Sequence, residues 1–196
     1  LEITGTKLKG IRYSLPVASA QVKSCLLFAG LFAEGETEVI ETQPTRDHTE
    51  RAFSAFGAPF KKVGTSLHIQ KANELHSASY QIPGDISSAA FFIVGALISK
   101  GSQIRLRDVG LNPTRIGLIQ VLKRMGAKIK IENQKEVPEL IGDLIISSSS
   151  LHGTQVGNNE IPFLIDEIPV LTLAAALAEG ETLITGAREL RVKESD

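Results

Sequence analysis

Three stretches of the chain share one order of polar and apolar positions. Each has a polar residue, an apolar run of helix length, and a glycine that leads toward strand-like residues; they are residues 19–35, 85–101 and 166–180. Because almost every side of each run is apolar, each is predicted to form a helix buried on all sides. The glycines Gly35, Gly101 and Gly180 are expected to turn the chain in a left-handed conformation.

A helix of a different kind follows the first two of these stretches. Residues 44–57 and 113–125 have charged or polar residues on one side and apolar residues on the other, which indicates surface helices. In both, a Pro-Thr-Arg tripeptide, ending at Arg46 and at Arg115, precedes a Gly-Ala pair by the same spacing. Strands are predicted around the helices, at residues 37–42, 61–71, 77–82, 127–132, 143–148 and 153–156.

This self-similarity predicts that one unit of helices and strands is used three times. Buried helices surrounded by two-sided helices and strands predict an α/β domain with its helices inside and its sheets outside. If the inner helices run parallel, the polar residues at their starts, Ser19, Asp85 and Asp166, share one end, where unpaired N–H groups favour an anion. The third copy stops inside its expected second helix, so we expect the sequence to be a truncated piece.

Composition narrows the possible partners. The 196 residues, 42% of them hydrophobic, are enough to bury a core. The 21 Lys and Arg against 22 Asp and Glu leave no basic field of the size that nucleic acid requires, so no nucleic-acid partner is expected. The apolar runs are shorter than the roughly 18 residues that cross a bilayer, and no signal peptide opens the chain. We therefore expect no membrane association and a cytoplasmic location.

Cysteine and histidine usage bears on metals and cofactors. Cys25 is the single cysteine, which excludes an internal disulfide and suits a reducing compartment. Because Cys25 lies in an apolar run, it is expected in the core. The four histidines have no metal-ligand spacing, and no glycine-rich nucleotide loop is present, so neither a metal nor a cofactor is expected.

Five motifs lie in order along nearly the whole chain. They are residues 15–24 (LPVASAQVKS), 44–50 (PTRDHTE), 82–89 (IPGDISSA), 164–169 (LIDEIP) and 190–196 (LRVKESD). Together they resemble the EPSP synthase (3-phosphoshikimate 1-carboxyvinyltransferase) family. The resemblance implies an α/β fold of three βαβαββ repeats in an inside-out barrel, with buried parallel helices and outer sheets. Residues 1–196 then correspond to a single domain, the shikimate-3-phosphate-binding half of a two-domain enzyme, with the first domain as its missing partner.

The family transfers the enolpyruvyl group of phosphoenolpyruvate to the 5-hydroxyl of shikimate 3-phosphate and releases phosphate, a step of aromatic amino acid biosynthesis that glyphosate inhibits. By this resemblance Asp166 matches the proton acceptor and Glu194 the proton-transferring carboxylate. Lys193 matches a contact of the substrate hydroxyl. Cationic groups that hold phosphoenolpyruvate in the family have no counterpart in the sequence, so the chain is expected to be inactive alone.

The resemblance also implies the substrate-binding residues. Ser19, Ala20 and Gln21 match the shikimate-phosphate site, and Gln21 and Glu194 also lie near phosphoenolpyruvate in the family. Arg46 matches an arginine over the shikimate ring. Where other members have a second serine this chain has Ala20, so one hydroxyl contact to the phosphate is lost.

Other interpretations remain open at this stage. Asp166 and Ser19 are also what a plain helix N-cap looks like, and Lys193 and Glu194 could form an exposed surface pair. A related enzyme, an enolpyruvyl transferase acting on UDP-N-acetylglucosamine, is disfavoured because its reactive loop cysteine is missing. A non-catalytic anion-binding module would need only the helix ends, without the acids and the lysine.

Overall fold

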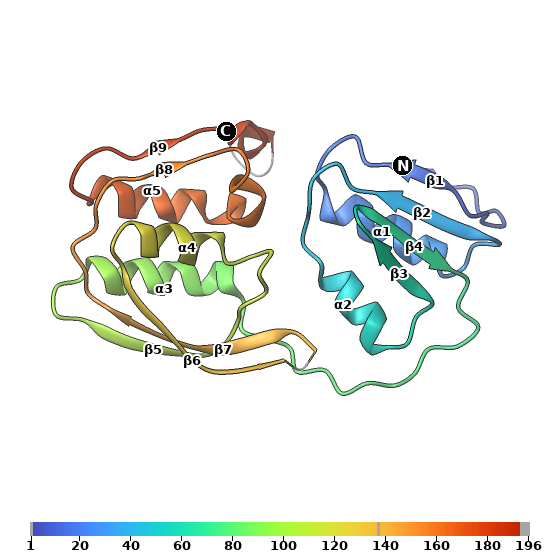
Figure 1. Cartoon of the computed structure of the whole chain (residues 1–196), viewed down its shortest axis with the longest axis horizontal. Coiled ribbons are helices and arrows are strands. Elements are labelled where there is room, and N and C mark those ends of the chain that lie inside the picture. The colour runs from blue at the N-terminus through green and yellow to red at the C-terminus, as the bar shows by residue number, and fades with distance from the viewer. Residues whose placement is uncertain (1, 137, 193–196) are drawn as a thin grey trace. The chain divides into compact units, whose positions relative to one another are not determined.

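The computed structural model describes residues 2–136 and 138–192 of the chain. Its contacts divide the chain into two compact units, Leu1–Tyr80 (unit 1) and Gln81–Asp196 (unit 2), which are coloured from blue to green and from green to red in Figure 1. Each unit has a sheet and a hydrophobic core of its own.

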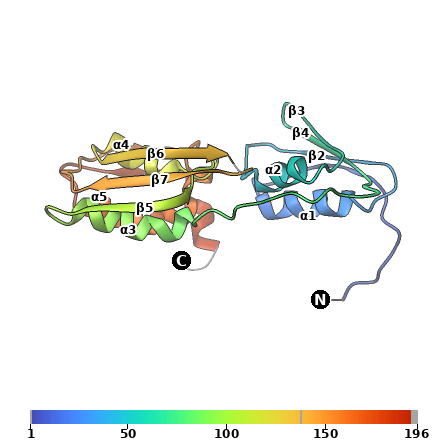
Figure 2. The same cartoon turned by 90° about the horizontal axis from the view of Figure 1, so that it is seen from below.

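Unit 1 contains one complete βαβαββ repeat. Its elements are β1 (Arg12–Ser14), α1 (Ala20–Gly30), β2 (Glu36–Ile40), α2 (His48–Ala55), β3 (Phe60–Val63) and β4 (Ser66–Gln70). The strands form one sheet in the order β1-β2-β4-β3, in which β1 and β2 are parallel and the other neighbours are antiparallel. Helix α1 lies along one face of this sheet (Figure 2). Leu27 of this helix and Leu31, its C-cap residue, pack with Val39, Leu67 and Ile69 in the core.

Unit 2 holds the second copy and the beginning of the third. The second copy comprises α3 (Ile86–Ile98), β5 (Gln103–Gly110), α4 (Gly117–Arg124), β6 (Lys128–Glu136) and β7 (Leu140–Ser147). The third comprises β8 (Gln155–Val156), the 3₁₀ helices η1 (Ile161–Phe163) and η2 (Ile165–Glu167), α5 (Ile168–Ala176), β9 (Leu183–Ile184) and the 3₁₀ helix η3 (Arg188–Val192). Figure 1 shows α3, α4 and α5 between the antiparallel β5-β7-β6 sheet and the parallel β8-β9 pair.

The predicted repeat is visible in the strand pairing. Parallel pairs flank the first helix of each copy: β1 with β2 around α1, β8 with β9 around α5, and a single bridge from Gly84 to Val109 around α3. Gly35, Gly101 and Gly180 all have positive φ, as expected. The strand expected at residues 77–82 is not formed, because this stretch belongs to the irregular connection between the units.

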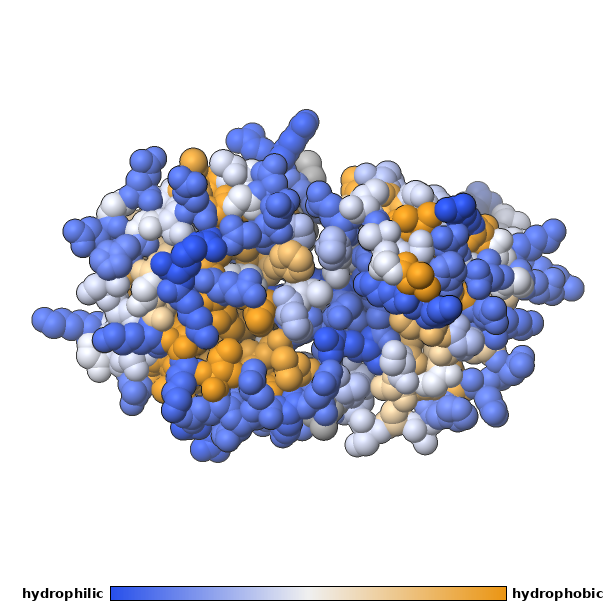
Figure 3. Space-filling view, viewed as in Figure 1, coloured by the Kyte–Doolittle hydropathy of each residue, from blue (hydrophilic) through white to orange (hydrophobic). Residues whose placement is uncertain are grey.

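Within the units, the apolar helices are covered on one side only. On α1, Cys25 and Phe28 are exposed, and so is Phe32 just beyond the end of the helix, although the Phe28 ring also packs edge to face on Phe53 of the core. The expectation that Cys25 lies in the core is therefore wrong: residues two apart on a helix point to opposite sides, and Leu27 faces the sheet. Side chains are exposed in the same way on α3 and α5, at Phe91, Phe92 and Leu173. Apolar atoms lie at the surface over the region of α3 in Figure 3.

Among the described residues, no helix has both the length and the apolar content that crossing a membrane requires.

Candidate anion-binding site and catalytic loop

The N-terminus of α1 has a neutral cap. Ser19 has an extended backbone, and its hydroxyl accepts a hydrogen bond from the Val22 N–H at 3.3 Å. The same hydroxyl donates to Gln21 Oε1 at 3.4 Å, and Ala20 is the first helical residue. The first turn contains no acidic residue, so the positive end of the helix dipole meets no carboxylate of its own. This end is suited to binding an anion.

The equivalent end of α3 already holds a carboxylate. Asp85 accepts hydrogen bonds from the N–H groups of Ser87 and Ser88 at 3.3 and 2.9 Å, and from the Ser88 hydroxyl at 2.8 Å. Burial raises the pKa of Asp85, but the bonds from Ser88 and Ser87 outweigh this. Together with the guanidinium of Arg115, 3.3 Å away, they hold the pKa of Asp85 below its ordinary value. A carboxylate therefore occupies the helix end at α3, whereas the equivalent end at α1, the candidate for an open anion site, has no such group.

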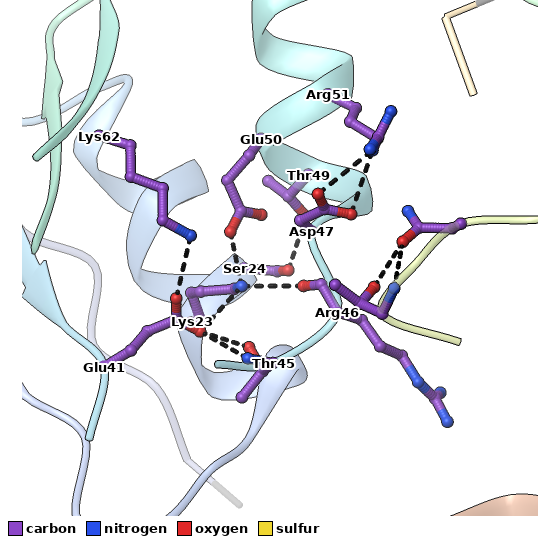
Figure 4. A network of polar contacts seen from close by, with 12 residues as sticks. Lys23, Ser24, Glu41, Thr45, Arg46, Asp47, Thr49, Glu50, Arg51 and Lys62 are labelled. Carbon is purple, nitrogen blue, oxygen red and sulfur yellow. Dashed lines mark hydrogen bonds and ion pairs between the residues drawn. The ribbon is translucent and has the colours of Figure 1, made fainter. Parts of the chain in front are cut away.

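Arg46 lies in the loop between β2 and α2, where its backbone is tied to α1. Its carbonyl accepts a hydrogen bond from Lys23 Nζ at 2.8 Å (Figure 4). Lys23 lies one helical turn after Ser19. The repeat equivalent of Arg46 is Arg115. That guanidinium reaches the start of its own copy's helix, 2.7 Å from Ser87 Oγ. In unit 1 the Arg46 carbonyl makes contact with α1, through Lys23.

Asp166 does not form the N-cap of α5. It is exposed and lies in the 3₁₀ helix η2, while the next residue, Glu167, is buried at the N-cap position without a side-chain capping bond. The interpretation of Asp166 as a plain helix N-cap is therefore wrong, because η2 adds a tighter turn before α5. Ser19, in contrast, is an N-cap as well as a candidate ligand.

A partly buried chain of hydrogen bonds supports the turn that carries Asp166. The Ser87 hydroxyl donates a hydrogen bond to the Glu167 carboxylate and accepts one from Arg115. The sequence did not single out Glu167, although an acid between Ile165 and Ile168 is a signal of a buried charge. The predicted site residues Lys193 and Glu194 lie outside the described residues.

No group of three or more potential ligands among His, Cys, Asp and Glu gathers in the part of the chain that the structure describes.

Comparison with known proteins gives one family. A family model described as EPSP synthase (3-phosphoshikimate 1-carboxyvinyltransferase) matches residues 1–196. The chain is 54% identical over 193 residues to the 3-phosphoshikimate 1-carboxyvinyltransferase of Methylococcus capsulatus, covering 98% of this chain and 44% of that protein. It is also 54% identical to the Desulforudis audaxviator enzyme of the same name, covering 100% of this chain and 46% of that protein.

Solved structures agree. The EPSP synthase of Acinetobacter baumannii superposes with a TM-score of 0.88 at 52% identity, over 98% of this chain and 44% of that one. The enolpyruvyl transferase NikO of Streptomyces tendae has a TM-score of 0.71 at 16% identity, over 92% of this chain and 45% of that one, which shows a shared fold alone. The chain spans less than half the length of the curated relatives it matches. It belongs to the EPSP synthase family.

Proposed function

We propose that this chain supplies the shikimate-3-phosphate-binding half of a 3-phosphoshikimate 1-carboxyvinyltransferase. The observation that carries the proposal is the contrast between the two equivalent helix ends. At α1 the cap is a neutral serine, whereas at α3 it is the carboxylate of Asp85. A phosphate bound at α1 gains the free N–H groups and the helix dipole, while the same phosphate at α3 meets a negative charge.

The substrate phosphate is held by the α1 end. The Ser19 hydroxyl donates to a phosphate oxygen once the ligand replaces its weak 3.4 Å contact with Gln21. Ala20 presents only a small side chain and its backbone, so the phosphate can approach closely but loses one hydroxyl contact. Arg46 lies over the shikimate ring, and its charge adds to the attraction for the phosphate.

The chemistry requires a base near the attacking hydroxyl and a proton donor for the methylene carbon. Asp166 takes the hydroxyl proton, for which a carboxylate must lie within hydrogen-bond reach of its substrate. The exposed position of Asp166 in η2 is compatible with contact to a ligand. Glu194 transfers a proton to the methylene carbon of phosphoenolpyruvate. Lys193 contacts the attacking hydroxyl of shikimate 3-phosphate and shares its charge with Asp166 and Glu194.

Phosphoenolpyruvate needs more than this chain. Gln21 and Glu194 contribute to its site, and the cations that bind its phosphate and carboxylate come from the rest of the enzyme. Orientation of two reactants and electrostatic stabilisation each supply several kcal/mol of catalysis, about 7–11 kcal/mol for orientation at its best. The chain alone is thus inactive. The proposed reaction requires no cofactor. We propose a cytoplasmic location for the enzyme.

We further propose that the two units act as one domain, as the threefold repeat predicts. The one-sided burial of α1, α3 and α5 supports this, because apolar faces of this kind are usually covered in a whole protein.

A chimeric enzyme tests the function directly. In it, residues 1–196 replace the 193 matched residues of the Methylococcus capsulatus relative. We expect the chimera to form product from shikimate 3-phosphate and phosphoenolpyruvate, the isolated chain to stay at background, and the Asp166→Asn chimera to lose at least about 100-fold in kcat. Full turnover by the isolated chain, or a folded chimera that is inactive, would contradict the proposal.

The UDP-N-acetylglucosamine alternative predicts a different substrate. It requires the chimera to consume UDP-N-acetylglucosamine in place of shikimate 3-phosphate. The non-catalytic alternative requires the chain to bind inorganic phosphate as tightly as shikimate 3-phosphate. Turnover assays of the chimera and binding assays of the chain with these three compounds decide between the alternatives.

A further inference from the structure

Lys23 is a fully buried lysine whose ammonium is saturated with hydrogen bonds. It is 0% exposed, although it belongs to the helix that carries the proposed phosphate site. An ammonium group has three N–H donors. They reach Glu41 Oε1 at 3.1 Å, Glu50 Oε1 at 2.6 Å and the carbonyl of Arg46 at 2.8 Å (Figure 4).

The charges around Lys23 balance locally. Glu41 and Glu50 are both buried, and one lysine cannot neutralise two carboxylates. Lys62 supplies the second positive charge, with its Nζ 3.5 Å from Glu41 Oε2 and its side chain 44% exposed. A buried ionic cluster of this kind is seldom more stable than a well-packed apolar one, since desolvation offsets the attraction between its charges. Its value therefore lies in the geometry that it imposes.

The cluster fixes the two residues that lead into α2. Glu41 Oε1 accepts hydrogen bonds from the N–H of Thr45 at 3.1 Å and from its hydroxyl at 2.6 Å. The next residue, Arg46, gives its carbonyl to Lys23. The loop that carries Arg46 is thus tied to the end of β2 through Glu41 and to α1 through Lys23.

The fold does not require these charges. In the second copy, the position equivalent to Lys23 is Ala89, and the position equivalent to Glu50 is Ile119, which is 2% exposed in the apolar core. The loop before Arg115 is held there in another way, by hydrogen bonds from the Thr114 N–H and hydroxyl to the Asn112 side chain at 2.8 and 2.6 Å. The charged cluster is therefore particular to the copy with the open anion site.

We propose that Lys23 is a positioning residue for shikimate 3-phosphate binding. It does not touch the substrate. It fixes the backbone of Arg46 relative to the first turn of α1, so that the guanidinium and the Ser19 end of the helix are pre-organised for one ligand. This inference rests on the function proposed above.

The test compares Lys23→Met with a matched triple variant of the chain. Lys23→Met alone leaves Lys62 to balance two buried carboxylates, so one negative charge is uncompensated, and the variant is expected to have a lower melting temperature. Adding Glu41→Gln and Glu50→Gln removes those charges while the Arg46 carbonyl still lacks its donor. We expect the triple variant to regain most of the melting temperature but to bind shikimate 3-phosphate at least 10-fold more weakly than the unmodified chain in calorimetry.

A second measurement does not depend on ligand binding. Amide hydrogen exchange of residues 41–51 is expected to be at least 10-fold faster in the triple variant, with residues 103–110 of β5 unchanged as an internal reference. Unchanged exchange in residues 41–51 overturns the inference, and so does a triple variant that binds shikimate 3-phosphate like the unmodified chain.

The failure of this inference is distinguishable from failure of the proposed function. If Arg46→Ala weakens binding and the triple variant does not, the inference fails and the function stands. If the unmodified chain does not bind shikimate 3-phosphate and the chimera does not convert it, the proposed function is wrong. Hydrogen exchange alone then decides whether Lys23 fixes the loop.

Discussion

Arg115 donates a hydrogen bond from Nη2 to the Ser87 hydroxyl at 2.7 Å, and this hydroxyl in turn donates to the buried carboxylate of Glu167. The start of α3 is thereby linked to the 3₁₀ turn that carries Asp166. The turn that carries the proposed proton acceptor is thus tied to α3 through its neighbour Glu167.

Ser87→Ala breaks this chain. The buried carboxylate of Glu167 loses a hydrogen bond, so we expect the free energy of unfolding to fall by about 1–3 kcal/mol in urea titrations. In the chimera we expect kcat to fall more than the affinity for shikimate 3-phosphate, because we propose that unit 1 binds this substrate. Ser88→Ala is the control for kcat, because the Ser88 hydroxyl donates to the Asp85 cap and not to Glu167. Equal kcat in both variants would show that the chain of hydrogen bonds does not support Asp166.

Asp85 predicts a pH dependence of stability. Its pKa is lowered in the folded chain, where the hydrogen bonds of Ser88 and Ser87 and the Arg115 charge outweigh the effect of burial. A lowered folded pKa gives stability that is present above the unfolded pKa of roughly 4 and is lost as the pH falls through the folded value.

Asp85→Asn keeps a capping side chain but removes this titration. We expect the variant to be less stable than the unmodified chain near neutral pH, and the difference to shrink as the pH falls below the unfolded pKa of roughly 4 and the folded carboxyl becomes protonated. Urea unfolding across this pH range measures the change. A difference that does not change with pH would mean that the Asp85 charge makes no net contribution.

Gly153 lies where a parallel strand pair passes too closely for a side chain. A Cβ added there would lie 2.0 Å from the carbonyl oxygen of Glu181, and the N–H of Gly153 donates to the Glu179 carbonyl at 2.7 Å. Gly153→Ala is therefore expected to lower the free energy of unfolding by about 1–3 kcal/mol or more. Gly157→Ala is the matched control, since nothing lies within 4 Å of its added Cβ. Equal unfolding midpoints of the two variants would contradict this packing.

The same variant tests whether residues 1–196 act as one domain. If they unfold together, Gly153→Ala in unit 2 also speeds hydrogen exchange of the core amides of β2 and β4 in unit 1. If exchange accelerates only in unit 2, the two units unfold independently and the single-domain proposal is wrong.

The sequence predicted what depends on local pattern. The helices α1 and α3, the left-handed glycines and the cap at Ser19 all follow from residues close together in the chain. It could not predict the Lys23 cluster, because its partners Glu41 and Glu50 lie 18 and 27 residues away and a lysine in a helix is usually exposed.

Two other differences also arise from tertiary structure. Cys25 was expected inside because free cysteines are often buried, but the sheet of unit 1 covers only the opposite side of α1. Asp166 was compatible with an N-cap, and only the fold shows that η2 precedes α5 and places Glu167 at the cap. Packing partners distant in the sequence decide which side of an apolar helix is covered. They also decide where a tight turn is inserted.

The central claim is that α1 and the Arg46 loop form a preformed site for shikimate 3-phosphate. The most direct measurement is a calorimetric titration of the chain with shikimate 3-phosphate and, separately, with inorganic phosphate. Arg46→Ala is compared with Arg12→Ala, which removes the same charge from an exposed side chain in the same unit. We predict saturable binding that is tighter than phosphate and at least 10-fold weaker in Arg46→Ala only. Binding no tighter than phosphate, or equally affected by both variants, would contradict a preformed site.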